Sequence, residues 1–313
     1  MTDKQFHHVP VMLASCLDAL AIRPNGIYVD GTLGGAGHSS EIAKRLAGGK
    51  LIGFDRDPAA INASSIRLAS FGDSIILVNR NHSEVKAVLK ELSIPQIAGA
   101  LLDLGVSSHQ LDEAERGFSY MQDAPLDMRM NPKDPMSAYE VVNTYSKEKL
   151  EDIIFTYGEE RWARRIVEFI CNAREAAPIK TTGELVEIIK KAVPKDARRD
   201  GPHPAKRTFQ AIRIEVNNEL SGLKQTVCDF IDVLAPGGRL AIITFHSLED
   251  RIVKTAFREK EKGCICPPEC PVCLCGIKSA GKVITRKPIL PTDEELNENP
   301  RARSAKLRVF EKK

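Results

Sequence analysis

The residues with the clearest chemical meaning form a glycine-rich turn and an acid that follows it. The turn covers residues 28–38 and has glycines at positions 31, 34, 35 and 37. Glycine has no Cβ, so such a turn can adopt positive φ angles and let the backbone approach a ligand closely. The hydrophobic segment 51–57 then supplies Asp55, whose carboxylate would face ribose hydroxyls. This pattern is typical of a site for a nucleotide-type cofactor.

The glycine-rich turn lacks the groups that usually hold a phosphate. A dinucleotide-binding turn ends on a third glycine, but Ser40 stands at that position after Gly35 and Gly37. The residue after Gly37 is His38, so no Walker lysine follows either. S-adenosylmethionine (SAM) has a ribose and an adenine but no phosphate, and it therefore suits this turn and Asp55. A tight turn beside a buried strand, without any ligand, is the structural alternative.

Another acid, Asp103, stands near the end of a later hydrophobic segment, within residues 101–108. In open α/β sheets, ligands lie beyond the carboxyl ends of the strands, where the strand order reverses. Asp103, Gly105 and Ser107 are therefore expected to lie close to the glycine-rich turn and to Asp55. A purely structural Asp103 that caps a helix is the alternative. The convergence of several strand ends favours the cofactor site.

The elements that must position these residues alternate along the chain. Hydrophobic runs predict strands at residues 27–30, 51–55, 75–78, 98–104 and 239–245. Helical periodicity predicts helices between the first four strands, and Asp57 and Pro58 suit the N-cap and first position of one of them. Such alternation with short connections indicates a parallel, doubly wound α/β sheet of the Rossmann-like type.

The alternation stops between residues 109 and 204, where the chain is charged and helical in character. Helices are predicted there at residues 148–157, 160–174 and 182–192. A long helix follows, with apolar residues at spacings of three and four from Ile212 to Leu234. The sequence therefore predicts a discontinuous sheet domain, residues 1–108 and 205–313, with an inserted helical domain, residues 109–204, that recognises the substrate.

Composition sets broad limits on the partners. The net charge of +3 and pI near 8.3 are mildly basic, which permits a nucleic-acid partner without requiring one. No apolar run is long enough to span a bilayer, and the first ten residues lack the hydrophobic region of a signal peptide. The chain is therefore expected in the cytoplasm, without a membrane partner. The sequence leaves the oligomeric state open, including a homodimer.

The chain resembles the bacterial small-subunit rRNA (cytosine-N4)-methyltransferase family, RsmH or MraW, nearly from end to end. Many separate motifs in the same order argue against a chance match. The segments that carry the resemblance are residues 8–13, 30–38, 54–58, 101–108, 115–119, 125–130, 157–161, 207–211, 245–251 and 299–304. The resemblance implies a class I SAM-dependent methyltransferase fold. It also implies N4-methylation of a cytosine in the decoding region of 16S rRNA, on an assembled small ribosomal subunit.

The resemblance further implies which residues hold SAM. They are Ala36, Gly37, His38, Asp55, His82, Asp103 and Gln110, and Gly35 belongs to the same turn. His82 departs from the family pattern, because relatives often have an aromatic residue such as phenylalanine there, placed to pack on the adenine. Histidine can also stack, but less hydrophobically. A solvated histidine at the start of a helix is the alternative.

The implied reaction sets requirements on the catalytic groups. The lone pair of N4 is delocalised into the pyrimidine ring, so alignment of N4, methyl carbon and sulfur must supply much of the rate. An acceptor for the amine N–H would favour the more tetrahedral nitrogen. Many amino-methyltransferases have an Asp/Asn/Ser-Pro-Pro-aromatic segment here, whereas this chain has Asp103-Leu-Gly-Val. The candidate catalytic residues are Asp103, Asp127 and Ser247, the last two as polar contacts to a base that has left its stack.

Two further clusters suggest contacts with RNA and metal. Eight lysines and arginines lie between residues 190 and 213, against Asp196 and Asp200, which suits phosphate neutralisation or a solvated linker. Five of the eight cysteines lie within residues 264–275, where disulfides are disfavoured in a cytosolic chain. Zinc ligation and free thiols both remain open. The predicted zinc ligands are Cys264, Cys266, Cys270 and Cys273.

Alternatives from other functional classes remain. A nicotinamide-dependent oxidoreductase would use a similar turn but requires the third glycine and a pyrophosphate site. A non-catalytic zinc and RNA-binding module would leave the turn and Asp55 unused. Among methyltransferases, a protein target or a ring carbon would fit the same cofactor site, although no Pro-Cys nucleophile follows Asp103.

Overall fold

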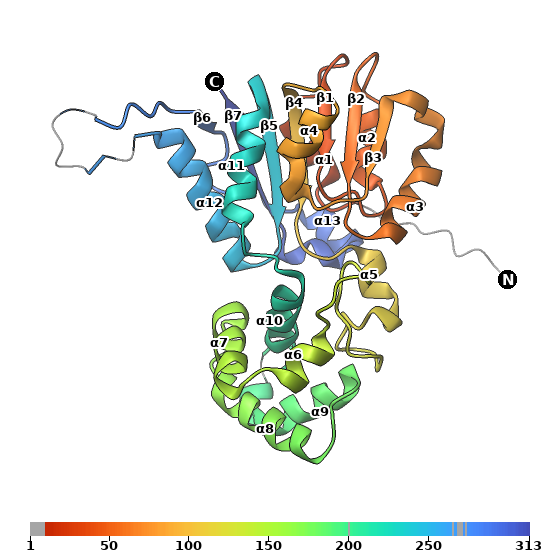
Figure 1. The fold of residues 1–313 in the computed structure, drawn as a ribbon, viewed down its shortest axis with the longest axis vertical. Coiled ribbons are helices and arrows are strands. Elements are labelled where there is room, and N and C mark those ends of the chain that lie inside the picture. Colours follow the sequence, from red (N-terminus) through yellow and green to blue (C-terminus); the bar gives the residue numbers. More distant parts are fainter. Residues whose placement is uncertain (1–9, 200, 265, 268–271, 273) are drawn as a thin grey trace. The chain divides into compact units, whose positions relative to one another are not determined.

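The structure is a computed structural model of the chain, and it describes all residues except 1–9, 200, 265, 268–271 and 273. The chain divides into two compact units (Figure 1). Unit 1 comprises Met1–Gly105 and Leu220–Lys313 and contains the sheet, whereas unit 2 comprises Val106–Glu219 and is mainly helical.

Unit 1 is built on one sheet, whose strand order in the described part of the chain is β3-β2-β1-β4-β5-β7-β6. The strands are β1 (Ile27–Asp30), β2 (Lys50–Phe54), β3 (Ile75–Val78), β4 (Ile97–Asp103), β5 (Leu234–Thr244), β6 (Gly281–Val283) and β7 (Lys306–Lys312). Strands β1 to β5 pair in parallel, and β7 runs antiparallel to β5 and β6. The chain order reverses between β1 and β4, which makes their carboxyl ends the switch point. The predicted doubly wound, Rossmann-like α/β fold is confirmed.

Helices cover both faces of this sheet (Figure 1). They are α1 (Leu13–Leu20), α2 (Gly37–Ala43), α3 (Pro58–Leu68), α4 (Val85–Glu91), α11 (Leu223–Val233), α12 (Ser247–Lys262) and α13 (Asp293–Glu298). Alternate strand residues separate into two cores, with Tyr28 and Leu101 packed beside α1 and α2 residues, and Val29 and Leu102 beside α4, α11 and α12 residues. Since both faces are covered, the central strands are almost continuously hydrophobic.

The predicted long helix from Ile212 to Leu234 is wrong. The structure has two helices, α10 (Lys206–Asn217) and α11, separated by left-handed residues at Asn218 (φ 54°) and Gly222 (φ 77°). Both helices bury one face in their own unit, so the apolar spacing continues through the break and conceals it. The strand that follows is also longer than predicted, because β5 begins at Leu234 and includes Gly237 at φ 72°.

The sequence analysis does not predict β6 or β7. In β7, Leu307 and Val309 face one core, whereas Phe310 packs in the other. Arg308 is only 4% exposed, because its guanidinium pairs with the Asp250 carboxylate at 2.6 Å (Nε to Oδ1). This ion pair lets a charged residue occupy a buried strand position, which obscures the hydrophobic pattern.

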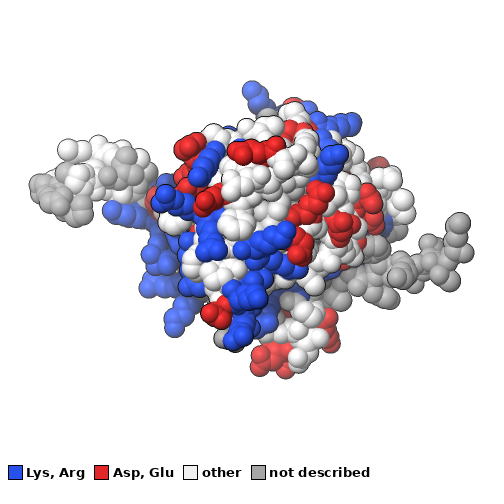
Figure 2. Space-filling view, turned by 90° about the horizontal axis from the view of Figure 1, so that it is seen from below, with Lys and Arg blue, Asp and Glu red and all other residues white. Residues whose placement is uncertain are grey.

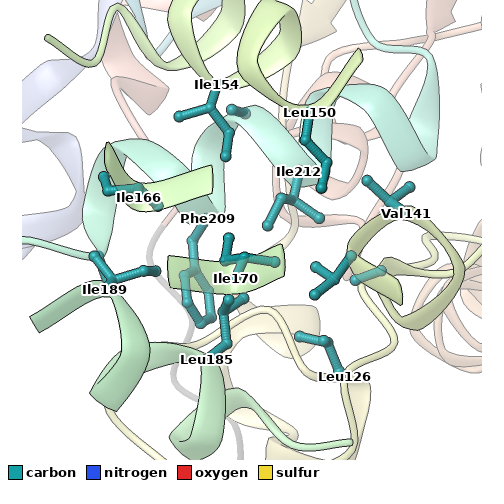
Figure 3. Close-up of a cluster of buried hydrophobic side chains, with 14 of the residues drawn as sticks. Leu126, Val141, Leu150, Ile154, Ile166, Ile170, Leu185, Ile189, Phe209 and Ile212 are labelled. Carbon is teal, nitrogen blue, oxygen red and sulfur yellow. The ribbon is translucent and has the colours of Figure 1, made fainter. Parts of the chain in front are cut away.

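Unit 2 packs its helices around a separate hydrophobic core (Figure 3). The helices are α5 (Ser108–Asp112), α6 (Ala138–Thr144), α7 (Lys147–Gly158), α8 (Ala163–Ala176), α9 (Thr182–Ala192) and α10. Figure 3 shows Phe209 and Ile212 of α10 directed into this core beside Ile154 and Ile170. The structure therefore groups α10 with the helical unit, whereas the sequence analysis placed its residues in the sheet domain.

Within the part of the chain that the structure describes, none of the helices combines the length and the apolar character needed to cross a bilayer.

Candidate functional site

The turn after β1 is held by the buried carboxylate of Asp30. Its Oδ2 accepts a hydrogen bond from the Ser39 hydroxyl at 2.6 Å, and its Oδ1 accepts one from the Thr32 backbone N–H at 3.1 Å. The next residue, Gly31, has no room for a side chain, since an added Cβ would lie 2.2 Å from Cδ2 of Leu102. These contacts fix the path of the chain as it leaves the strand.

The predicted turn residues have different steric surroundings. Ala36 adopts a left-handed conformation (φ 56°) at the N-cap of α2 and is fully buried. A Cβ on Gly37 would lie 2.4 Å from Cγ of Pro10, so this glycine lets two segments approach closely. A Cβ on Gly35, in contrast, would meet no atom within 4 Å. The space beside Gly35 is therefore open to a ligand.

Asp55 lies at the end of β2, as predicted, and its carboxylate contacts the turn. Oδ2 accepts a hydrogen bond from the Gly34 N–H, and Oδ1 accepts one from the Asp57 N–H, both at 2.8 Å. Burial raises the pKa of Asp55 to about 6, although the two backbone hydrogen bonds act in the opposite direction. The carboxylate is held in one orientation, and each of its oxygens keeps acceptor capacity for a hydroxyl.

Asp103 ends β4 beside the same turn. Its Oδ1 is buried and has no hydrogen-bond partner among the described residues. Burial, with the negative charges of Asp30 and Glu249, raises the pKa of Asp103 to about 8. An unpaired buried acceptor costs free energy. Oδ1 is therefore suited to a donor that a ligand brings.

Two histidines lie near these acids at the carboxyl ends of the strands. His38 Nε2 lies 2.9 Å from the Val11 carbonyl and donates to it, so in the neutral ring Nδ1 is the acceptor and faces Asp103 Oδ2 at 3.9 Å. His82 follows β3, and its Cβ lies 3.2 Å from the position of a Cβ on Gly31. Burial and the nearby Arg56 lower the pKa of His82 to about 4. His82 is therefore a neutral ring near neutral pH.

The remaining predicted site residues have local partners. Gln110 belongs to unit 2, where its Oε1 accepts a hydrogen bond from the Ser107 N–H at 3.1 Å in the capping box of α5. Asp127, also in unit 2, forms a bidentate pair with the Arg129 guanidinium, with Oδ2 2.6 Å from Nη2. Ser247 lies in unit 1 as the exposed first residue of α12, after β5. The structure thus brings Asp55, His38, His82 and Asp103 to one sheet edge.

The sequence analysis did not assign a role to Glu249. This residue is 2% exposed, and its Oε2 accepts a hydrogen bond from the Phe245 N–H at 2.8 Å. It occupies the third helical position of α12 after the N-cap His246, which is the spacing of a capping box and was readable from the sequence. Together with burial, the charges of Asp30 and Glu249 raise the pKa of Asp103, so a cationic ligand placed there would favour the ionised carboxylates.

The predicted zinc ligands are only partly described. Cys270 and Cys273 lie outside the described residues. The thiols of Cys264 and Cys266 do lie together, and the third member of their cluster is Cys275, which the sequence analysis did not include.

Comparisons with known proteins give a consistent result. The profile of one family, described as the MraW methylase family, matches residues 5–313. Proteins named "Ribosomal RNA small subunit methyltransferase H" are similar along nearly their whole length. The one from Finegoldia magna is 60% identical over 309 residues, which is 98% of this chain and 99% of that protein. The one from Clostridioides difficile is 57% identical over 309 residues, with the same coverage.

A third relative of the same name, from Brevibacillus brevis, is 57% identical over 313 residues and covers 100% of both chains. Among solved structures, an rRNA methylase from Streptococcus thermophilus aligns over 97% of this chain and 98% of its own, at 14% identity and a TM-score of 0.42. That structural likeness is too low to carry an argument about the site.

Proposed function

Because this chain belongs to the MraW methylase family, we propose that it transfers the methyl group of SAM to the N4 amino group of a cytosine in 16S rRNA. The chain is a SAM-dependent methyltransferase, and its relatives are named for the RNA of the small ribosomal subunit. The cytosine, its N4 position and its place in the decoding region come from the family resemblance.

The grouping of Asp55, His38, His82 and Asp103 at the switch point is the observation that carries the proposal. The space beside Gly35 and the unpartnered Oδ1 of Asp103 suit a ligand that combines a ribose, an adenine and positive charge. SAM has these features, since its sulfonium and its amino group are cationic. A nicotinamide dinucleotide is anionic at its pyrophosphate, whereas the ionised forms of Asp55 and Asp103 would be favoured by a cation and not by an anion.

The residues of unit 1 divide the work of binding SAM. The Asp55 carboxylate, fixed by two backbone N–H groups, would accept hydrogen bonds from the ribose hydroxyls. Gly35, Ala36, Gly37 and His38 would form the wall beside the methionine part. The neutral ring of His82 would pack against the adenine. Gln110 remains a predicted cofactor contact from the resemblance.

Asp103 would orient the reacting groups. When bound, SAM supplies an electrophilic methyl carbon: the C–S bond breaks as N4 forms the new C–N bond, and N4 loses one proton. Asp103 Oδ1 can accept a hydrogen bond from an N–H group of the target base, which favours a tetrahedral nitrogen. Asp127 and Ser247 remain predicted contacts to the target base.

The predicted basic stretch would contact the RNA backbone. Five of its eight cations are exposed, namely Lys191, Lys195, Arg199, Lys206 and Arg207. Arg213 instead forms a bidentate pair with Glu219, at 2.8 and 2.9 Å, and has a structural role. Figure 2 shows lysines and arginines in several groups on the face drawn, with acids between some of them. The exposed cations are suited to phosphates.

The setting of the reaction is part of the same proposal. We expect the substrate to be the RNA within an assembled small ribosomal subunit, in the cytoplasm, and the enzyme to act as a monomer or a homodimer. Methylation assays that compare naked 16S rRNA with isolated small subunits test the first point, and sedimentation equilibrium of the purified chain decides the oligomeric state.

Nucleoside mass spectrometry of 16S rRNA tests the function directly. A strain without this gene is expected to lose N4-methylcytidine from the decoding region, and the gene on a plasmid to restore it. The Asp103→Ala variant is expected to leave the modification absent. An unchanged N4-methylcytidine level in the deletion strain would refute the proposed substrate.

A further inference from the structure

Three cysteine thiols converge in the segment between α12 and β6. The thiol sulfurs of Cys264, Cys266 and Cys275 all lie within 4.8 Å of one another. The Sγ atoms of Cys264 and Cys275 are 3.7 Å apart, which is far longer than the 2.0 Å of a disulfide bond. Two thiolates bound to one Zn²⁺ at about 2.3 Å in tetrahedral geometry are roughly 3.8 Å apart. The observed spacing is thus that of a zinc–thiolate pair.

The backbone around the cluster holds its two sides together. Helix α12 ends at Gly263 (φ 70°), where an added Cβ would lie 2.5 Å from backbone atoms of Lys278 and Ser279. The Ala280 N–H donates to the Lys260 carbonyl at 2.9 Å. The chain that leaves α12 at Cys264 therefore lies beside the chain that returns towards β6 from Cys275. This closure presents thiols from both sides to one point.

Hydrophobic burial does not explain the cluster. The neighbouring apolar side chains of Val272, Leu274 and Ile277 are 68%, 82% and 47% exposed. None of the three described cysteines belongs to a hydrophobic core cluster of the described residues. The described residues of this segment bury little apolar surface, and a structural metal ion is a usual source of stability for such a segment.

A hydrogen bond to sulfur supports the same interpretation. The Leu274 backbone N–H lies 3.3 Å from Cys266 Sγ, within the range of an N–H···S hydrogen bond. Such donors neutralise part of the charge of metal-bound thiolates and fix their orientation.

We propose that Cys264, Cys266 and Cys275 ligate a structural Zn²⁺ ion that is separate from the methyl-transfer site. Three thiolates leave one position of a tetrahedral ion for a fourth ligand. The site's role would be to hold the chain at Cys264 beside the chain at Cys275, close to the exposed cation Lys278.

Metal content of the full-length chain tests the site. The protein is purified without chelators and with a thiol-free reductant, and zinc is measured by inductively coupled plasma mass spectrometry. We expect one equivalent of zinc per chain. Cys264→Ser and Cys275→Ser should each weaken zinc binding about tenfold or more. The matched control is Cys228→Ser, which replaces a half-buried cysteine of α11 in the same unit and should retain the metal.

Cobalt substitution separates a built site from adventitious metal. Co²⁺ in a tetrahedral thiolate site gives intense thiolate-to-metal charge-transfer absorption, which should appear in the unsubstituted chain and in Cys228→Ser but fade in Cys264→Ser. SAM titration of each variant shows whether it is folded. Thiols that all titrate without bound metal, disulfides in their place, or zinc that survives Cys264→Ser and Cys275→Ser would each overturn the proposal.

Discussion

At the level of single residues, the candidate site is defined by carboxylates with unusual protonation. Asp103 has a pKa near 8 and Asp55 a pKa near 6, both because burial disfavours the ionised form. A cationic ligand would reverse this effect by favouring the charged carboxylate. We therefore expect the binding of SAM to be coupled to proton release.

The first prediction concerns the pH dependence of SAM affinity. Bound SAM should lower the pKa of Asp103 below 8, so the affinity should rise with pH and level off above about 8. The rise should be roughly tenfold between pH 6.5 and pH 8. Asp103→Asn should remove most of it. Isothermal titration at a series of pH values measures the SAM affinity of both proteins. The amino group of SAM also titrates, but it does so with both proteins and therefore cancels in the comparison.

Without SAM, Asp103→Asn should increase the stability of the protein at high pH. The pKa of Asp103 is higher in the folded chain than in the unfolded chain. The contribution of this carboxyl to the free energy of unfolding is therefore fully present below about pH 4 and is lost as the pH rises towards 8. At pH 8, Asp103→Asn should therefore be more stable than the unsubstituted chain by roughly 1–3 kcal/mol. This difference is smaller than the full pKa shift would give, because the side chain is 24% exposed and solvent screens part of the effect. Equal pH slopes in the two proteins would contradict the assignment of Asp103.

The second prediction concerns Asp55. In Asp55→Asn, the uncharged amide can accept through one oxygen only, so one of the two backbone N–H groups loses its partner. The affinity for SAM should fall about 10- to 100-fold, the range expected for a hydrogen bond to a charged group. Asp73→Asn, at an exposed acid of the same unit, is the control and should leave affinity unchanged. An Asp55→Asn protein that binds SAM normally would remove Asp55 from the site.

At the level of elements, the turn between β1 and α2 contains two glycines with opposite requirements. Gly31 touches Leu102 so closely that no side chain fits, whereas Gly35 faces open space. One glycine serves packing and the other leaves room for a ligand. This contrast gives a matched pair of substitutions.

The third prediction uses this pair. Gly31→Ala should lower the free energy of unfolding by about 1–3 kcal/mol, the usual cost of overpacking. Gly35→Ala should change stability by less than about 0.5 kcal/mol but should weaken SAM binding, because the new methyl group enters the ligand's space. Chemical denaturation and isothermal titration of both variants provide the test. Normal SAM affinity in Gly35→Ala would place the cofactor elsewhere.

Sequence patterns predicted the central strands and the glycine-rich turn, but they failed where one pattern concealed another. The first four strands, the turn and Asp55 follow from hydrophobic runs, glycine positions and a strand-end acid. The break at Asn218 was invisible because α10 and α11 continue one apolar spacing in two different cores. Strand β7 was hidden by Arg308, whose burial depends on a distant partner, Asp250. The raised pKa of Asp103 likewise depends on its burial and on the nearby charges of Asp30 and Glu249, which only the fold brings about.

At the level of the whole molecule, the chain separates the proposed methyl-transfer chemistry from the proposed binding of RNA. The switch-point residues Asp55 and Asp103 belong to unit 1, whereas the basic stretch belongs to unit 2. Substitutions in one unit should therefore affect SAM affinity or RNA affinity separately.

The fourth prediction tests this separation. The double variant Lys191→Ala/Lys195→Ala should bind RNA more weakly, and the slope of log affinity against log salt should decrease by about 1 for each lost phosphate contact. SAM affinity should stay unchanged. The control, Lys50→Ala/Lys90→Ala, removes two exposed lysines of unit 1. Filter binding at several salt concentrations measures the slopes, and equal slopes in both double variants would refute a role for the basic stretch.

The pairing of β4 with β5 has a consequence for how the protein folds. Strand β4 ends at Asp103 and the adjacent strand β5 begins at Leu234, so all of unit 2 lies between them in the chain. Closing so long a loop as unstructured chain costs considerable entropy, whereas the helical contacts of unit 2 are local and form quickly. We expect unit 2 to become ordered first and the pairing of β4 with β5 to form late. Refolding should therefore show hydrogen-exchange protection in α7 and α10 before β5.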